Sequence, residues 1–235
     1  MSVLALFVGS VYLVPRIEFR FAKAKAQKEL LSGKTADQIA YKNAELNSIP
    51  QFPPKKIVPS IDYTNTIWLT QPGCDFGFPA DRFTRDSQTN RQNVELHGAK
   101  YRMLVHPGSE PDEWETAMQF VNETNLFEFS RRAFNTTKDD IDRAPNKYAL
   151  QRCLFMLQAK AMLAAVGYTD SCIEFDRGDL KGFIIGDPQR RKYVYIRVYY
   201  SGGRKYIDIS VIQEKHIQLS DLEQLISTIK ARYSN

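Results

Sequence analysis

The strongest constraint on the fold is a pair of alternating apolar segments near the end of the chain, separated by two glycines. Residues 193–200 read YVYIRVYY and residues 204–212 read RKYIDISVI, with Gly202-Gly203 between them. A two-residue Gly-Gly turn between such segments predicts a β-hairpin. Because side chains alternate between the two faces of a strand, only one register keeps the apolar residues on a single face. That register pairs Val198 with Ile207, Ile196 with Ile209, and Val194 with Val211.

The opposite face of this hairpin carries tyrosine and arginine and is the strongest candidate for a binding surface. In the same register Arg197 pairs with Asp208, which brings opposite charges together. Tyrosine and arginine are enriched at protein interfaces, and cations interleaved with aromatic rings also suit stacking on nucleic-acid bases. The predicted binding surface consists of Tyr193, Tyr195, Arg197, Tyr199 and Tyr206.

The elements beside the hairpin predict an α+β fold, in which an antiparallel β-meander (C-terminal hairpin about 193–212) packs against helices. Strands expected over residues 172–176 and 180–185 precede the hairpin. A capping box at Ser220–Glu223 starts a terminal helix. Its apolar stripe should pack on the Val/Ile face of the hairpin. The stripe consists of Leu222, Leu225, Ile226 and Ile229.

Upstream of these strands, residues 60–108 are interrupted by glycine and proline and predict loops and short strands. A short hairpin is expected over residues 93–96 and 99–106. Apolar residues at helical spacing then predict three helices, and the longest ends at Gly167. Their predicted ranges are 110–121, 126–134 and 146–166.

The N-terminal end carries the signature of a membrane anchor. Met1–Val14 contains no charged side chain, and a basic stretch follows Pro15. Twelve apolar residues form a helix of about 18 Å, shorter than the roughly 30 Å of hydrocarbon in a bilayer. We therefore expect an anchor helix that either spans the membrane or inserts into it, and a buried segment of a soluble protein is the alternative. The membrane-proximal cations are Arg16, Arg20, Lys23, Lys25 and Lys28.

The charge distribution predicts the orientation of this anchor. Residues 1–34 hold six Lys/Arg and two Glu, so most of the net charge of +5 lies there. Lys and Arg collect on the cytoplasmic side of a membrane, which places the soluble part on the cytoplasmic, or equivalent organellar, side. The three cysteines cannot all pair, which agrees with a reducing compartment.

Three regions follow from these patterns. Residues 1–34 are expected to form the apolar anchor with its basic stretch. Residues 35–59 are expected to form a short helix and a Pro-rich linker, since four prolines in ten residues favour an extended backbone. Residues 60–235 are expected to form the soluble α+β domain.

No sequence motif identifies a reaction. There is no phosphate-binding Gly-rich loop, and no Cys or His pair has the spacing of zinc ligands. We therefore predict no cofactor and no metal. An enzyme, hydrolase- or transferase-like, remains an alternative through a site near Cys74, His97 and His106, since Cys74 lies in a predicted loop and both histidines border a predicted hairpin.

The order of strands, hairpin and terminal helix over residues 170–232 is similar to that of PsbP-like or DcrB-like domains, which occur in membrane-associated accessory proteins. It is also similar to small intermembrane-space domains of mitochondrial import and assembly factors. With the anchor, the sequence predicts a membrane-anchored, non-catalytic accessory or binding protein that docks a protein partner, for example as a subunit of a membrane complex. A nucleic-acid or anionic-surface binder that uses the Tyr/Arg face is the other alternative.

Overall fold

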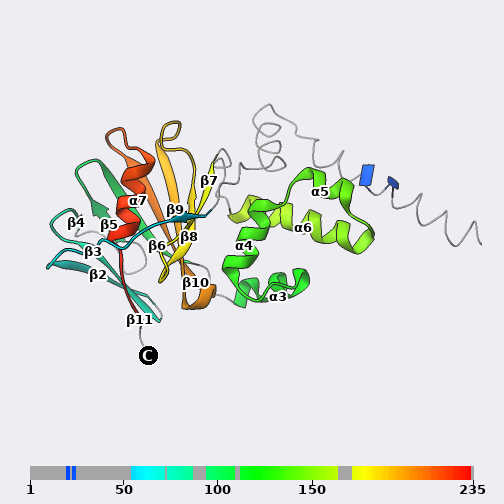
Figure 1. Cartoon of the computed structure of the whole chain (residues 1–235), viewed down its shortest axis with the longest axis horizontal. Coiled ribbons are helices and arrows are strands. Elements are labelled where there is room, and N and C mark those ends of the chain that lie inside the picture. The colour runs from blue at the N-terminus through cyan, green and yellow to red at the C-terminus, as the bar shows by residue number, and fades with distance from the viewer. Residues whose placement is uncertain are drawn as a thin grey trace, which may run out of the picture. The chain divides into compact units, whose positions relative to one another are not determined.

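The computed structural model describes most of the chain beyond residue 53, and it divides the chain into two compact units (Figure 1). Unit 1 comprises residues 1–48 and 132–166, and unit 2 comprises residues 49–131 and 167–235. The predicted apolar segment and most of the predicted linker lie outside the described residues, so both stay predictions. The described residues are 20–21, 23–24, 54–71, 73–86, 94–108, 112–163 and 171–233.

Unit 2 is built on a large mixed sheet and a small antiparallel sheet, so the predicted α+β class is confirmed (Figure 1). The large sheet has eight strands in the order β1-β7-β8-β9-β10-β6-β5-β4. Strand β1 runs parallel to β7, and every other pair in this sheet is antiparallel. The strands are β1 (Lys55–Lys56), β4 (Thr84–Arg85), β5 (Val94–His97), β6 (Tyr101–Pro107), β7 (Cys172–Asp176), β8 (Lys181–Ile185), β9 (Tyr193–Tyr200) and β10 (Lys205–Gln213).

The predicted register of the β9–β10 hairpin is confirmed, because all three apolar pairs and the Arg197–Asp208 pair occur as expected. The connection between the strands differs from the prediction. It is a four-residue connection over residues 201–204, whose first three residues form a 3₁₀ turn, and the pairing begins at Tyr200 and Lys205. Gly202 and Gly203 have φ of 69° and 84°, in the left-handed region that glycine adopts without strain.

One face of the large sheet, here called the inner face, forms the core with α7 (Leu219–Thr228) and the small sheet. The Val and Ile side chains of the three predicted apolar pairs of β9 and β10 are buried there, together with the predicted stripe of α7. The helix begins before the predicted Ser220. The Asp221 carboxylate accepts a hydrogen bond from the Gln218 backbone N–H at 2.8 Å, so the N-terminal cap lies two residues earlier than predicted.

The small sheet lies at the end of this core and has the order β11-β3-β2. Every residue of β3 is buried. A Cβ at Gly77 would lie 2.6 Å from the Thr66 side chain and 3.0 Å from the Trp68 ring, so only glycine allows this close approach. Strand β11 was not predicted; its four residues directly follow the predicted apolar stripe of the terminal helix. The strands are β2 (Thr66–Gln71), β3 (Cys74–Pro79) and β11 (Lys230–Tyr233).

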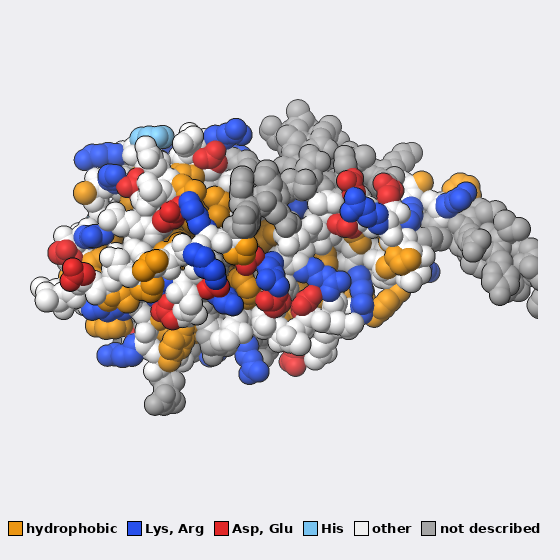
Figure 2. All heavy atoms as spheres, viewed as in Figure 1, with side chains coloured by type: hydrophobic (Ala, Val, Ile, Leu, Met, Phe, Trp, Pro, Cys, Tyr) orange, Lys and Arg blue, Asp and Glu red, His pale blue; other side chains and the backbone are white. Residues whose placement is uncertain are grey.

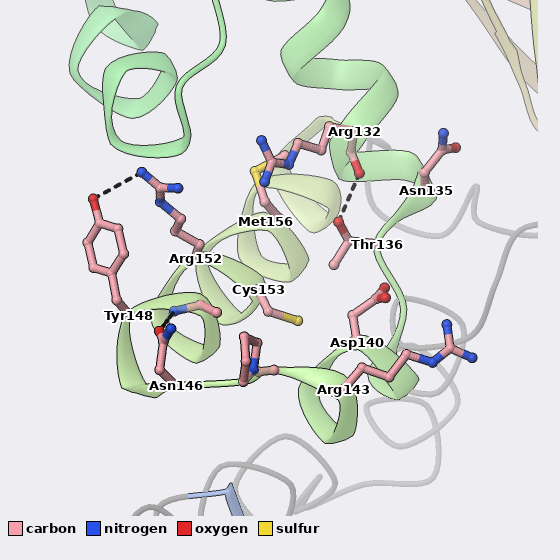
Figure 3. Close-up of a pocket in the computed structure, with 13 residues that line it drawn as sticks. Arg132, Asn135, Thr136, Asp140, Arg143, Asn146, Tyr148, Arg152, Cys153 and Met156 are labelled. Carbon is pink, nitrogen blue, oxygen red and sulfur yellow. Dashed lines mark hydrogen bonds between the residues drawn. The ribbon is translucent and has the colours of Figure 1, made fainter.

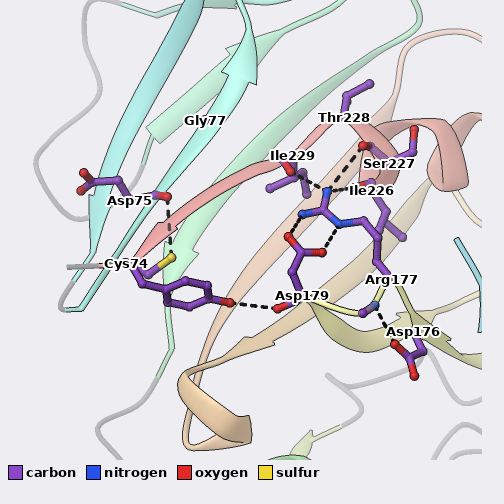
Figure 4. Close-up of polar contacts among 12 residues, drawn as sticks. Cys74, Asp75, Gly77, Asp176, Arg177, Asp179, Ile226, Ser227, Thr228 and Ile229 are labelled. Carbon is purple, nitrogen blue, oxygen red and sulfur yellow. Dashed lines mark hydrogen bonds and ion pairs between the residues drawn. The ribbon is translucent and has the colours of Figure 1, made fainter. Parts of the chain in front are cut away.

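A buried arginine joins the turn between β7 and β8 to the end of α7 (Figure 4). The side chain of Arg177 has no exposed surface. Its Nη1 donates to the carbonyl oxygens of Ile226, at 2.8 Å, and of Ile229. Its Nε and Nη2 donate to the two carboxylate oxygens of Asp179 at 2.8 and 2.6 Å. Arg177 thus supplies further donors to carbonyls at the C-terminal end of the helix, where positive charge is favoured.

Four helices lie between β6 and β7 in the described part of the chain, and the predicted helices correspond to three of them. They are α3 (Asp112–Val121), α4 (Leu126–Asn135), α5 (Lys138–Arg143) and α6 (Lys147–Leu163). Unit 1 contains α5 and α6, which share a small apolar cluster around Ile141, Leu150 and Leu157. The lysine that interrupts the apolar run of α6, Lys160, is fully buried and donates to the Thr136 carbonyl at 3.0 Å.

Replacement of Arg177 by methionine tests the importance of this contact for stability. We expect Arg177→Met to lower the free energy of unfolding by roughly 3 kcal/mol, because it leaves helix carbonyls and Asp179 without their partner. Urea unfolding of the full chain measures the change. Arg190→Met is the matched control, since Arg190 is 74% exposed and pairs with Asp187 at 3.5 Å. Equal effects of the two substitutions would contradict the prediction.

Candidate functional site

The candidate site is the face of the large sheet opposite the core, here called the outer face. Strand register places side chains in rows across it. One row runs through Arg197, Asp208 and His106, and another through Tyr195, Ser210 and Leu104. A third row runs through Tyr193, Ile212 and Arg102. All five residues of the predicted Tyr/Arg surface therefore lie on this face, but their environments differ.

Helix α4 covers one half of the outer face. Tyr199 and Tyr206 are 2% and 5% exposed. The Tyr199 hydroxyl donates to Ser130 Oγ at 2.6 Å, and its ring makes an edge contact with Phe127 of the same helix. Burial raises the pKa of Tyr199 well above its usual range, so the hydroxyl stays protonated and can keep donating. Both tyrosines belong to the predicted binding surface, but their side chains are buried, and α4 contacts Tyr199 directly.

Arg197 and Asp208 form a two-point ion pair within the same half. Arg197 Nε and Nη2 donate to the two Asp208 carboxylate oxygens at 2.7 and 2.8 Å. The guanidinium also lies over the Tyr206 ring, 4.5 Å from its centroid. Burial disfavours the charged guanidinium, but the Asp208 carboxylate outweighs it and holds the pKa of Arg197 above its usual range. Arg197 is therefore a buried structural cation rather than an exposed binding group.

The other half of the outer face is partly exposed on β9 and β6, whereas Ser210 and Ile212 of β10 between them are buried, and we call it the open face. It consists of Tyr193, Tyr195, Arg102 and Leu104. Tyr193 is 42% exposed, and the other three side chains are partly exposed. In their rows, Tyr193 and Arg102 are separated by Ile212, and Tyr195 and Leu104 by Ser210, so each pair lies two strands apart. Two of the five predicted binding residues are therefore at least partly exposed, and so are two residues of β6 in the same rows that sequence reasoning did not identify.

The residues of the predicted enzyme site do not meet. Cys74 is fully buried on β3 and belongs to the inner core, and burial raises the pKa of its thiol to about 11. His97 pairs with Arg102, while His106 lies four residues further along β6, a separation of roughly 13 Å along the strand. The two histidines are therefore not adjacent, and Cys74 lies on the opposite side of the sheet.

One cluster among the described residues has the composition of a metal site. Asp86, Glu95 and His97 each offer one ligand atom, and these atoms lie within 4.8 Å of one another. Sequence reasoning considered only Cys and His pairs at zinc spacing. It missed this cluster because Asp86, which follows β4, comes beside Glu95 and His97 only when β4 pairs with β5.

Unit 1 contains a separate pocket of about 530 Å³ beside α5 and α6 (Figure 3). Its lining includes Arg132, Arg143 and Arg152 and one acidic residue, Asp140. Arg152 donates to the Tyr148 hydroxyl at 3.0 Å and stacks over its ring. The Asp140 carboxylate accepts from the Thr137 backbone N–H at the start of α5. Arg152 and Asp140 are therefore held by contacts with nearby residues of the same unit.

Of the predicted membrane-proximal cations, the structure describes two. Arg20 is exposed, and Lys23 Nζ donates to the Asp142 carbonyl oxygen of α5 at 2.7 Å. Arg16, Lys25 and Lys28 lie outside the described residues. Among the residues that the structure does describe, none of the helices combines the length and apolar character needed to cross a membrane.

The surface charges are mixed in sign. On the face seen in Figure 2, Lys and Arg side chains are interspersed with Asp and Glu rather than gathered into one basic patch. A groove that follows a nucleic-acid backbone carries a continuous positive surface. This face does not have that arrangement.

Comparison of the chain with protein-family models, with curated proteins and with solved structures gives no match.

A substitution at Asp208 tests whether the Arg197–Asp208 ion pair stabilises the fold. We expect Asp208→Asn to lower the free energy of unfolding by about 3 kcal/mol, since it leaves a buried guanidinium without its counter-charge. The matched control, Asp187→Asn, removes a charge from the exposed Arg190 pair and should cost less than about 1 kcal/mol. Denaturant unfolding checks both values. A cost for Asp208→Asn as small as the control's would mean that the pair is not structural.

Proposed function

We propose that the protein is a membrane-anchored accessory protein whose α+β part docks a protein partner on the open face. The observation that carries this proposal is the contrast between the two halves of one sheet surface. Helix α4 covers the first half with Phe127 and Ser130. The second half presents the same kind of side chains without a helix of the described chain over Tyr193. A partner segment there would continue the layer that α4 begins.

The composition of the open face suits a protein more than a nucleic acid. Tyrosine, arginine and an aliphatic side chain, Leu104, share this face of the sheet, and interface centres are enriched in tyrosine and arginine and depleted of lysine. The basic Arg102 is balanced by Glu95, whose Oε1 accepts from Arg102 Nη1 at 2.8 Å. The net positive charge that phosphate binding requires is therefore weak at this surface.

The anchor part of the proposal has a direct test in the full-length chain. We expect full-length protein to sediment with membranes and to resist extraction by carbonate. The double substitution Leu6→Arg/Val11→Arg should release it into the soluble fraction, because an arginine near the centre of an inserted helix costs about 2.5 to 3.5 kcal/mol. The control Leu6→Ile/Val11→Leu keeps the apolar character and should stay with membranes. Full-length protein found in the soluble fraction would refute the anchor.

The docking part is tested by affinity purification of the anchored chain after crosslinking, compared with two variants. A partner that co-purifies with the natural sequence should be lost from Tyr193→Ala/Tyr195→Ala, since truncation of a hot-spot tyrosine costs at least about 2 kcal/mol, a roughly thirtyfold change in affinity. Tyr233→Ala is the control, because Tyr233 is 44% exposed in the same unit but lies on the small sheet.

Two outcomes would overturn the docking proposal. One is a set of co-purifying proteins that is unchanged in the double variant. The other is equal loss in the double variant and in Tyr233→Ala, which would indicate a general effect on the fold. A circular-dichroism melting curve of each variant shows whether the fold persists.

A further inference from the structure

The edge of the outer face brings three metal-ligating side chains together through strand pairing. Strand β4 pairs with β5 so that Thr84 lies opposite His97. The Asp86 backbone N–H donates to the Glu95 carbonyl at 3.0 Å, which continues the same pairing by one residue. Glu95 and His97 are two residues apart and therefore point to the same face. The backbone of two paired strands, rather than a loop, thus sets the positions of all three side chains.

The distances within the cluster match those of a metal site. His97 Nε2 lies 3.4 Å from Glu95 Oε1 and 3.8 Å from Asp86 Oδ2. A tetrahedral Zn²⁺ ion with bonds of about 2.0 to 2.2 Å holds its nitrogen and oxygen ligands roughly 3.3 to 3.6 Å apart. Closure of the cluster around an ion therefore needs only small side-chain movements.

From this geometry we infer that Asp86, Glu95 and His97 bind a divalent transition-metal ion of the Zn²⁺ type. One imidazole and two carboxylates supply three protein ligands, and water fills the remaining position. The side chains are 20% to 41% exposed, so the ion has a path from solvent. Imidazole also favours Zn²⁺ over Mg²⁺ and Ca²⁺, which take oxygen ligands in larger number.

Arg102 is the group that opposes the ion. Its Nη1 lies 2.8 Å from Glu95 Oε1, the same oxygen that faces His97. In the absence of an ion, the guanidinium offsets part of the negative charge of the two carboxylates. When the ion binds, the two positive charges repel, and affinity is lower than the ligands alone would give. Removal of the Arg102 charge should therefore strengthen metal binding. A chance contact between a histidine and two carboxylates would not show this effect.

Titration of the tag-free full-length chain in detergent micelles with Zn²⁺, followed by calorimetry, tests the inference. Titration with Co²⁺ adds a visible absorption spectrum that reports the coordination geometry. We expect one ion per chain with micromolar or tighter affinity for Zn²⁺, and no binding of Mg²⁺ in the same range. His97→Ala and Asp86→Asn should each weaken Zn²⁺ binding at least tenfold, and Arg102→Gln, which keeps a hydrogen-bond donor for Glu95, should tighten it several-fold.

His106→Ala is the matched control, because His106 lies on the same face but four residues along β6 from the partner of His97. It should leave the affinity unchanged. The inference fails if Zn²⁺ binds only at millimolar concentration, if His97→Ala and His106→Ala have equal effects, or if Arg102→Gln weakens binding. These outcomes do not depend on whether the protein docks a partner or sits in a membrane.

Discussion

The register between β9 and β10 is the constraint on which the rest of unit 2 depends. These strands lie at the centre of the eight-stranded sheet, and their pairing decides which residues face the core. Val194, Ile196 and Val198 pack on the inner face with α7 and the small sheet, so the alternating tyrosine and arginine residues must face outward. The neighbours β8 and β6 continue the same alternation. One register therefore determines both the core and the candidate site.

The sequence predicts local elements well where a periodic pattern and a turn signal agree. The β9–β10 register, the stripe of α7 and the paired strands of the 93–106 hairpin all follow from such patterns, and the structure confirms them. The observed ends of an element differ from the predicted ones where a longer-range or a competing local contact determines where the element begins. Asp221 caps the Gln218 N–H, and so α7 begins earlier than the Ser220 capping box indicates.

The environment of a residue on the outer face could not be predicted in the same way. Tyr193 and Tyr199 occupy equivalent positions of one strand, and the alternating pattern assigns both to the same face. Only the docking of α4, more than sixty residues earlier in the chain, buries Tyr199 against Ser130 and leaves Tyr193 exposed. The contacts of Arg177 with α7 could not be predicted from the pattern either, because they join residues about fifty positions apart in the sequence. Neither contact has a periodic signal in the sequence.

Arg102 links the two proposed properties of the outer face. It is a member of the open face, and it holds the Glu95 carboxylate that belongs to the Asp86–Glu95–His97 cluster. An ion bound to Glu95 would repel the guanidinium and weaken its hydrogen bond to the carboxylate. A variant at Arg102 therefore changes both properties and cannot separate them. A substitution at Tyr193 should affect only the docking surface, and one at His97 only the ion. The two residues are well separated, because Ile212 and Arg102 lie between them in one row across the sheet.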